Sequence, residues 1–211
     1  MGKKDWIALA VIAVTFLAGA FLYPSLPERM ASHWNAAGEV DGYMPRFWGT
    51  FLLPLVNLGV LGLFMLIPKI MVYKENFKKF EGEYMRFRLV MILFMAYIYA
   101  LALFANLGRS FSMNFAMAPA LLALLYFAGE LCINSRRNYF IGMRTPWALA
   151  DEGVWKRTNK VGGRLLQLTG VVLLFALWLK AHAALIIVGY IIFFLIYVMA
   201  YSYLEYKKLR K

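Results

Sequence analysis

Six long hydrophobic runs alternate with polar segments along this chain of 211 residues. Most of the runs approach the roughly 20 residues that an α-helix needs to cross the hydrocarbon core of a bilayer. They occupy residues 6–23, 48–68, 89–107, 115–133, 165–179 and 183–203. The pattern predicts an all-α fold, a polytopic transmembrane helical bundle of about six spans. We interpret the first run as a retained membrane helix, although Ala18, Gly19 and Ala20 also match the small-x-small pattern of signal-peptide cleavage sites.

The composition agrees with a membrane protein. Hydrophobic residues make up 63% of the chain and charged residues only 16%, whereas a soluble domain is about 45–50% apolar. Much of the apolar surface must therefore face lipid. A net charge of +12 would otherwise suggest a nucleic-acid partner, but the pattern predicts no water-facing domain to carry it. We expect these cations to face an anionic membrane surface instead.

The polar segments fall into two groups by charge. Those within residues 1–5, 69–88, 134–164 and 204–211 carry 19 of the 23 Lys and Arg residues, and the segments that alternate with them carry the other four. Positively charged loops remain in the cytoplasm. We therefore predict cytoplasmic termini, a cytoplasmic loop after the fourth run and an outward-facing loop after the first, in a prokaryotic plasma membrane. We divide the chain into a two-helix unit, residues 1–70, and a four-helix unit, residues 71–211.

The charged segment at residues 69–88 carries a helical pattern of its own. Its aromatic residues recur at spacings of four, three and four: Tyr73, Phe77, Phe80 and Tyr84. Such spacing places side chains on one face of an α-helix. We therefore predict that this segment is helical.

Residues 138–164 form the longest polar stretch between two hydrophobic runs. Thr145 followed by Pro146 is a typical helix start, because Thr accepts hydrogen bonds from the first free amides and Pro tolerates the first helical position. Just before it, Gly142 lies between Ile141 and Met143. A glycine there indicates a backbone turn or a close approach.

Aromatic and basic residues separate onto two faces of the helix predicted after Pro146. One face carries Trp147, Val154 and Trp155, and a basic stripe carries Arg157, Lys160 and Arg164. This pattern is typical of an interfacial helix, with its indoles at the level of the lipid headgroups. Two interpretations remain open: a membrane-anchored connector, or a cytoplasmic docking surface for a partner.

The first loop, residues 24–47, is rich in turn-forming residues. It also holds His33, Asn35, Glu39 and Asp41. A His with two carboxylates can bind a divalent metal, as a membrane enzyme would require, but this spacing fits no ligand signature and supplies no clear third or fourth ligand. We favour an ordered outer loop with a turn at Asp41 and Gly42. Its aromatic belt would consist of Trp34, Tyr43 and Trp48.

Polar residues inside the hydrophobic runs raise a second possibility. Glu130 lies in the fourth run, and carboxylates within a membrane are costly and often functional. Arg136 and Arg137 follow one to two helical turns later and could offset its charge. An ion or proton role for Glu130 with Asn57 and Asn106 would make the protein a small-solute or ion-coupled transporter. The alternative is that Asn57, Asn106, Asn114 and Gln167 form interhelical hydrogen bonds.

Signatures of catalysis are absent from the sequence. It contains no G-x-S-x-G, H-E-x-x-H or P-loop motif. The single cysteine, Cys132, excludes an internal disulfide and a CxxC motif. His182 lies in a short connector that we predict to face solvent. We therefore predict neither an enzyme nor a bound cofactor.

Two motifs carry a resemblance to a known family. Residues 138–163, NYFIGMRTPWALADEGVWKRTNKVGG, are similar to the signature of the SdpI family of membrane proteins, roughly N-x-x-I-G-I-R-T-x-W-[TA]-L followed by V-W-x-x-T-x-x-x-G. The matches are Asn138, Ile141, Gly142, Arg144, Thr145, Trp147, Leu149, Val154, Trp155, Thr158 and Gly162. Met143 departs from the second isoleucine of the signature. The first loop resembles the uncharacterised domain that precedes this signature, with the core H-[FW]-N-x-x-G-x-x-D-G-[YW]. Its matches are His33, Trp34, Asn35, Gly38, Asp41, Gly42 and Tyr43.

The resemblance implies a function that composition does not. The family's namesake is an immunity protein that protects a toxin-producing cell from its own secreted antimicrobial peptide. It also holds a soluble repressor at the membrane when toxin is present. By resemblance, a peptide toxin would meet the outer loop at His33, Asn35, Gly38 and Asp41. A small cytoplasmic repressor would dock on the residues Asn138, Ile141, Gly142, Arg144, Thr145, Pro146, Trp147, Trp155 and Lys160.

Overall fold

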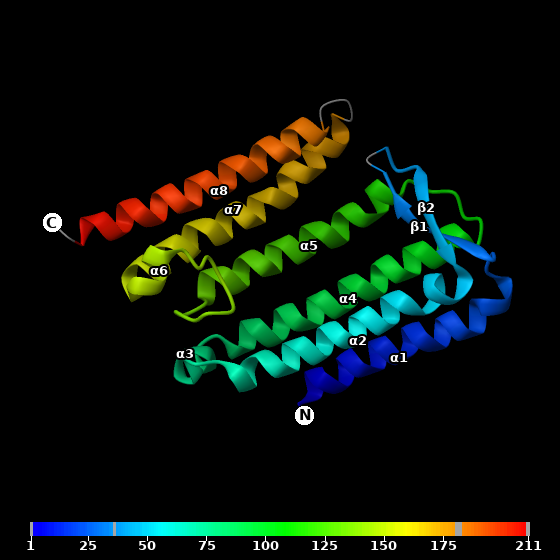
Figure 1. The fold of residues 1–211 in the computed structure, drawn as a ribbon, viewed down its shortest axis with the longest axis horizontal. Coiled ribbons are helices and arrows are strands. Elements are labelled where there is room, and N and C mark those ends of the chain that lie inside the picture. Colours follow the sequence, from blue (N-terminus) through cyan, green and yellow to red (C-terminus); the bar gives the residue numbers. More distant parts are fainter. Residues whose placement is uncertain (1, 36, 180–182, 210–211) are drawn as a thin grey trace. The chain divides into compact units, whose positions relative to one another are not determined.

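The computed structural model describes residues 2–35, 37–179 and 183–209. Within these residues, six helices are long and apolar enough to cross a membrane, as the hydrophobic runs predict (Figure 1). They are α1 (Lys3–Leu22), α2 (Arg46–Ile70), α4 (Glu81–Asn106), α5 (Met113–Asn134), α7 (Glu152–Trp178) and α8 (Ala183–Lys208). A lipid-embedded segment must satisfy its backbone polar groups internally, which a helix does. Residues 180–182, and with them His182, lie outside the described part.

The chain forms two compact units. The first consists of Met1–Phe64 and Arg88–Leu121, and the second of Met65–Phe87 and Leu122–Lys211. Each unit combines segments that are distant in sequence, since long helices carry the chain from one unit into the other. The sequence-based division after residue 70 stays a prediction.

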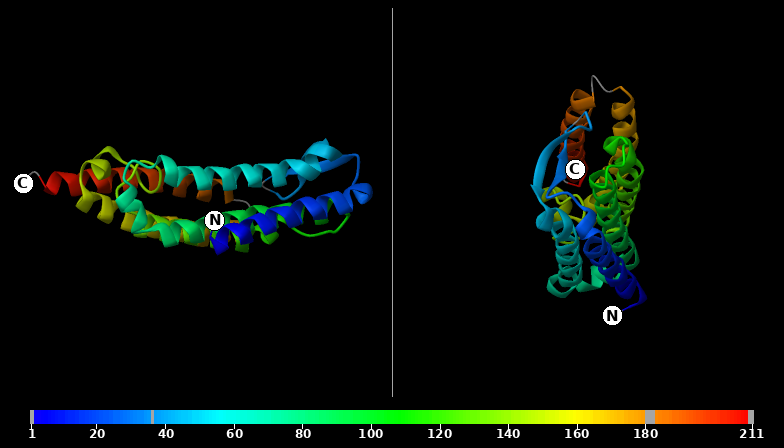
Figure 2. Two further views of the ribbon diagram at one scale, coloured as in Figure 1. Left: turned by 90° about the horizontal axis from the view of Figure 1, so that it is seen from below. Right: turned by 90° about the vertical axis from the view of Figure 1, so that its right-hand side faces the viewer.

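In the first unit, α1, α2 and α4 run alongside one another, and the first loop lies at one end (Figure 2). Asn57 of α2 donates a hydrogen bond of 3.2 Å to the carbonyl oxygen of Ile92 on α4, which confirms the interhelical bond predicted for this buried side chain. A second polar link joins α1 and α4, where Asp5 forms an ion pair with Arg88. Both side chains are buried, so the ion pair is shielded from solvent.

The first loop folds as a β-hairpin, which the all-α prediction misses. A short 3-10 turn, η1 (Tyr23–Ser25), ends α1, and strands β1 (Arg29–Trp34) and β2 (Val40–Pro45) then pair antiparallel. The turn predicted at Asp41 and Gly42 is wrong, since both residues lie in β2. Gly42 pairs with His33, and a Cβ at Gly42 would lie 2.9 Å from the Cβ of His33. This glycine therefore serves strand pairing.

The actual hairpin turn is organised by Asn35. Its side-chain oxygen accepts hydrogen bonds from the backbone amides of Ala37 (2.9 Å) and Glu39 (3.1 Å). Gly38 adopts a left-handed φ of 83°, a conformation that costs other residues free energy. Asn35 and Gly38 are thus turn-forming residues, and their match to the family core has a structural cause.

Asn106 fixes the hairpin to the end of α4. Its side-chain oxygen accepts a hydrogen bond of 2.7 Å from the amide of Ala31, and its side-chain nitrogen donates one of 3.0 Å to the carbonyl of Ala31. The predicted helix-to-helix bond is therefore replaced by a bond from a helix to strand β1. A bidentate amide pair of this kind satisfies both backbone groups of a residue that lacks a strand partner on that side.

The predicted helix at residues 69–88 is confirmed in part. It consists of a short helix, α3 (Lys74–Lys78), and the first turns of α4, separated by residues 79–80. Phe77, Phe80 and Tyr84 are buried, whereas Tyr73 precedes α3 and is only partly buried. The three buried rings pack edge to face, with centroids 5.2 to 5.5 Å apart.

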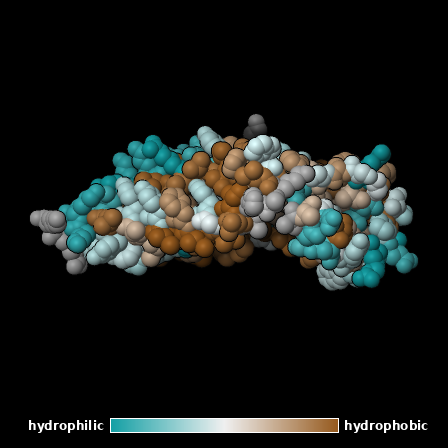
Figure 3. All heavy atoms as spheres, turned by 90° about the horizontal axis from the view of Figure 1, so that it is seen from above, coloured by the Kyte–Doolittle hydropathy of each residue, from teal (hydrophilic) through white to brown (hydrophobic). Residues whose placement is uncertain are grey.

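Of the remaining helices of the second unit, α5 and α7 pack closely because of small residues. A Cβ at Gly163 on α7 would lie 2.6 Å from the backbone oxygen of Gly129 on α5. Without side chains at these two positions, the helix backbones approach each other, as in many membrane helix pairs. Gln167 donates a hydrogen bond of 3.3 Å to Tyr126 across the same pair. Figure 3 shows hydrophobic side chains over the middle of the helices and hydrophilic ones near the C-terminus.

Candidate functional site

The segment between α5 and α7 folds around the buried side chain of Asn138. This amide makes four hydrogen bonds, accepting from the amides of Phe140 and Ile141 and donating to the carbonyls of Arg136 and Ile141, at 2.7 to 3.0 Å. The side chain of Asn138 is fully buried. It supplies the backbone partners that an irregular segment cannot obtain from a helix or a sheet.

Two residues on α7 hold the next part of the loop. Asn159 accepts a hydrogen bond of 2.7 Å from the amide of Met143, and the indole nitrogen of Trp155 donates one of 3.1 Å to the carbonyl of Ser135. Gly142 lies between these contacts with a φ of 103°. A Cβ there would come within 3.1 Å of both Ser135 and Trp155. The glycine of the signature thus meets two requirements, a left-handed backbone and close packing.

The predicted helix start is confirmed. The Thr145 side chain accepts a hydrogen bond of 3.1 Å from the amide of Ala148 at the beginning of α6 (Pro146–Ala150), with Pro146 in the first turn. The same hydroxyl is hydrogen bonded to Ser202 on α8. Trp147 packs against Tyr203, with ring centroids 5.2 Å apart. The loop is therefore attached to α8 as well as to α7.

The single interfacial helix predicted after Pro146 is wrong. The chain is extended at Asp151, which ends α6 and caps α7 by accepting a hydrogen bond of 2.8 Å from the amide of Val154. Val154 and Trp155 are fully buried inside the protein, so neither side chain contacts lipid headgroups. The ring of Trp155 fills the space under the loop, so this residue cannot touch a partner directly.

The arginines of the loop differ in how far they are engaged. Arg137 donates to the carbonyls of Leu149 and Ala150 and lies over the ring of Tyr73. Arg144 is exposed and donates one hydrogen bond of 2.7 Å to the carbonyl of Tyr139. The hydroxyl of Tyr73, hydrogen bonded to that of Tyr139, raises the pKa of Tyr139.

The basic stripe on α7 is interrupted by an ion pair. Arg157 pairs with Glu205 of α8, which also binds Lys208. Lys160 and Arg164 are exposed. Of the predicted stripe, these two cations remain available for a partner.

Glu130 is paired with a residue that sequence proximity does not indicate. Its carboxylate lies 2.9 Å from the guanidinium of Arg86, near the start of α4. Arg136 and Arg137, the cations expected to offset it, are not the ones bound to it. The acid retains 28% side-chain exposure and is neutralised by its partner, an arrangement that fits a structural ion pair.

At the hairpin, His33 and Asp41 are brought together across the strands. The Nδ1 atom of His33 contacts the Asp41 carboxylate, and both side chains are exposed. Among the described residues, no group of three or more His, Cys, Asp or Glu side chains is placed to hold a metal ion. The pair therefore acts as a cross-strand contact.

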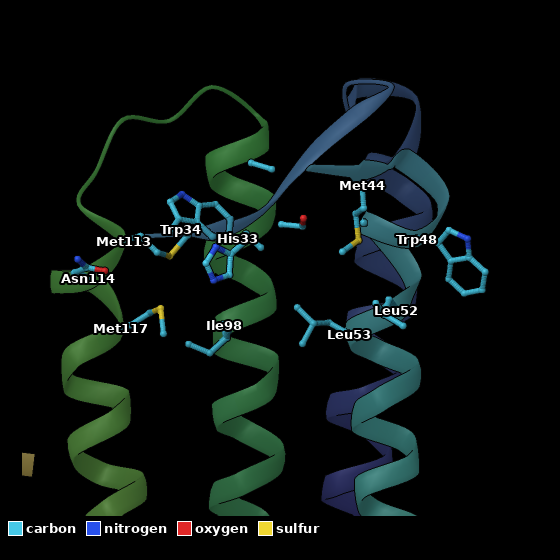
Figure 4. Close-up of a pocket in the computed structure, with 14 residues that line it drawn as sticks. His33, Trp34, Met44, Trp48, Leu52, Leu53, Ile98, Met113, Asn114 and Met117 are labelled. Atoms are coloured by element: carbon cyan, nitrogen blue, oxygen red, sulfur yellow. The ribbon is translucent and has the colours of Figure 1, made fainter. Parts of the chain in front are cut away.

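A cavity of about 360 Å³ lies under the hairpin. Its walls come from the hairpin, α2, α4 and the beginning of α5. In Figure 4 the rings of His33 and Trp34 lie on the α5 side, beside Met113 and Met117, and the Trp48 ring points outward. Apart from His33, Ser32 and Asn114, the lining is apolar or amphipathic, which is typical of ligand cavities.

Several residues of these sites are not among the predicted ones. Asp151, Asn159, Ser135, Ser202 and Arg86 all support the loop or its neighbours. Asp151 before Glu152 is a helix-start signal that the sequence does contain. The other four act across long sequence separations, for which no local pattern exists.

The fold and the loop together define a multi-pass helical membrane protein with a folded polar segment between two spans. Residues 134–203 match the SdpI/YfhL protein family, and residues 10–58 match a domain of unknown function (DUF1648). The chain is 25% identical to the immunity protein SdpI of Bacillus subtilis (strain 168) over 209 residues, 98% of each chain. The SdpI/YfhL match covers about a third of the chain, and it includes the folded loop, α7 and most of α8. No solved structure matches it.

Gly142→Ala tests the tight packing of the loop. The substitution forces an L residue into a left-handed backbone and a Cβ against Asn159, so it should destabilise the protein by about 1–3 kcal/mol. Thermal unfolding of the purified protein in detergent would measure this. Gly82→Ala is the matched control, because a Cβ there meets nothing within 4 Å. Equal melting of the two variants would contradict the packing argument.

Proposed function

We propose that this chain is an immunity protein that protects its cell from a secreted antimicrobial peptide. The observation that carries the proposal is the likeness to the immunity protein SdpI over 98% of both chains. The two matched regions contain the hairpin and the folded loop as well as spans. The likeness therefore involves more than the hydrophobic pattern that membrane proteins share.

The proposal includes an orientation. The excess of Lys and Arg in alternate polar segments favours a cytoplasmic loop between α5 and α7 and an external hairpin. This arrangement would expose the hairpin to a secreted peptide and the loop to soluble proteins of the cell.

Cysteine labelling tests the orientation. The natural Cys132 is buried and should give little background, whereas Glu39 in the hairpin turn and Lys156 on α7 are exposed. In intact cells, a membrane-impermeant maleimide should modify the Glu39→Cys variant and leave the Lys156→Cys variant unmodified. Both should react after permeabilisation. Labelling of Lys156→Cys in intact cells would reverse the proposed orientation.

We place the toxin contact at the hairpin and the cavity beneath it. Within the described residues, β1 and β2 form a two-stranded sheet. Asn106 occupies the outer edge of β1 at Ala31, so we place an added extended peptide at the outer edge of β2. The apolar lining of the cavity suits the hydrophobic side chains that a membrane-active peptide must carry. Backbone pairing and an apolar pocket together would provide both affinity and selectivity.

A survival assay tests immunity and this contact together. A toxin-sensitive bacterial host that produces the chain should survive secreted antimicrobial peptides, including those of the chain's own source strain. Met117→Trp should fill the cavity and reduce survival to the level of cells without the chain. Met117→Leu, which keeps the volume nearly constant, should protect as well as the natural chain. Killing that is equal with and without the natural chain would refute the immunity proposal.

We further propose that the loop side recruits a small cytoplasmic repressor. The exposed cations Lys160 and Arg164 lie on one face of α7 at a spacing of four, where an acidic patch on a partner would find complementary charge. Trp155 takes no direct part, since it is buried. It would support the docking surface from below.

Reversing the charge of this face tests the recruitment. The double variant Lys160→Glu and Arg164→Glu should abolish membrane recruitment of the cytoplasmic repressor that this proposal requires, measured by fractionation of toxin-treated cells. Survival should persist if the repressor is not needed for protection. The matched control is Lys74→Glu, which reverses an exposed cation on α3, outside this face of α7. Unchanged recruitment in the double variant would exclude this face.

A further inference from the structure

A groove separates the folded loop from α8 within the second unit. Its volume is about 650 Å³. One wall is formed by the loop and the other by the middle of α8. The residues that matter for its chemistry are Tyr139, Arg144, Pro146, Leu195, Val198 and Met199.

The groove is held open by the loop's own hydrogen bonds. Asn138 and Asn159 fix the loop backbone, and Thr145 bonds to Ser202 on α8. A wall built in this way does not need to fold when a ligand arrives. Such preformed sites lose little conformational entropy on binding.

The charged side chain of the groove is that of Arg144. Arg144 is exposed, and in the described part of the chain its guanidinium makes a single hydrogen bond, to the carbonyl of Tyr139. Arg carries five N–H donors in a planar fork that matches a phosphate group. Most of these donors therefore remain available to an anion.

The apolar part of the groove extends from Arg144 toward the middle of the α8 span. Ser202, which binds the neighbouring Thr145, lies three residues beyond Met199, or about one helical turn. The lining of α8 continues from Met199 back to Phe194, inside the span Leu185–Lys208. Arg144 and the apolar part of the groove are thus arranged along the α8 span, which is the direction in which the acyl chain of a bilayer lipid extends.

We propose that this groove binds one anionic phospholipid, with its phosphate on Arg144 and an acyl chain along Leu195 and Met199. Residues Leu195 and Met199 are 57% and 45% exposed, so an acyl chain would cover apolar surface that the protein leaves open. The net charge of +12 favours a lipid with net negative charge over a zwitterionic one. The proposal is independent of toxin immunity and adds a lipid-binding site to the signature loop.

Native mass spectrometry of the full chain, delipidated and titrated with phosphatidylglycerol or phosphatidylcholine, tests the proposal. Phosphatidylglycerol should bind with a stoichiometry of one tight site and phosphatidylcholine much more weakly. Arg144→Gln should weaken phosphatidylglycerol binding about ten- to a hundredfold, because charge-assisted hydrogen bonds are lost. Arg164→Gln removes an exposed cation outside the groove and should bind as the natural chain does.

A second variant separates lipid binding from folding. Leu195→Trp fills the groove from an exposed position on α8 and should also weaken phosphatidylglycerol binding, although every cation is retained. Thermal unfolding without lipid should be unchanged in both variants. Equal binding of the two lipids would indicate only a general lipid contact and overturn the proposal. So would full binding by both variants, or a change of oligomeric state in Leu195→Trp, which would assign the groove to a second copy.

Discussion

The second unit depends on how the backbone of residues 135–145 is satisfied. This segment is neither helix nor strand, yet Asn138 in it is fully buried, and buried backbone amides and carbonyls without partners destabilise a fold. Asn138 from within the loop and Asn159 from α7 provide those partners. These two side-chain amides define the path of the loop backbone. The indole of Trp155 beneath the loop and the helix cap at Thr145 depend on that path.

The backbone polar groups of the hairpin in the first unit are also satisfied, but by different interactions. Its strands satisfy each other, Asn35 satisfies the turn, and Asn106 satisfies Ala31 from α4. In both units an irregular connection is therefore stabilised by asparagine side chains. The amide group suits this task because it carries a donor and an acceptor without a charge.

The sequence predicted the helices well and the connections less well. Hydrophobic length alone defines the six spans, since lipid leaves the backbone few alternatives. The hairpin was missed because Asp41 and Gly42 are typical turn residues, whereas the structure places Gly42 opposite His33 to make room for it. Trp147 and Trp155 share a helical face only if the helix is continuous, and the extended residue Asp151 interrupts it.

At the candidate sites, local backbone features were likewise predictable from the sequence, and contacts between distant residues were not. Gly142 and the cap at Thr145 were predictable because each acts on its own backbone. The partners of Glu130 and Trp155, which are Arg86 and Ser135, lie 44 and 20 residues away. No periodicity in one sequence encodes such contacts. They arise only when the helices have packed.

The ion pair of Asp5 and Arg88 bears on how the protein enters the membrane. Arg88 directly precedes the third hydrophobic run and is buried inside the protein, where an unpaired charge is costly. Its anion lies 83 residues earlier in the chain. Synthesis proceeds from the N-terminus, so α1 and its carboxylate are already present when α4 emerges. The first helix thus prepares a neutralising site for the third span, and the order of synthesis becomes part of the assembly of the fold.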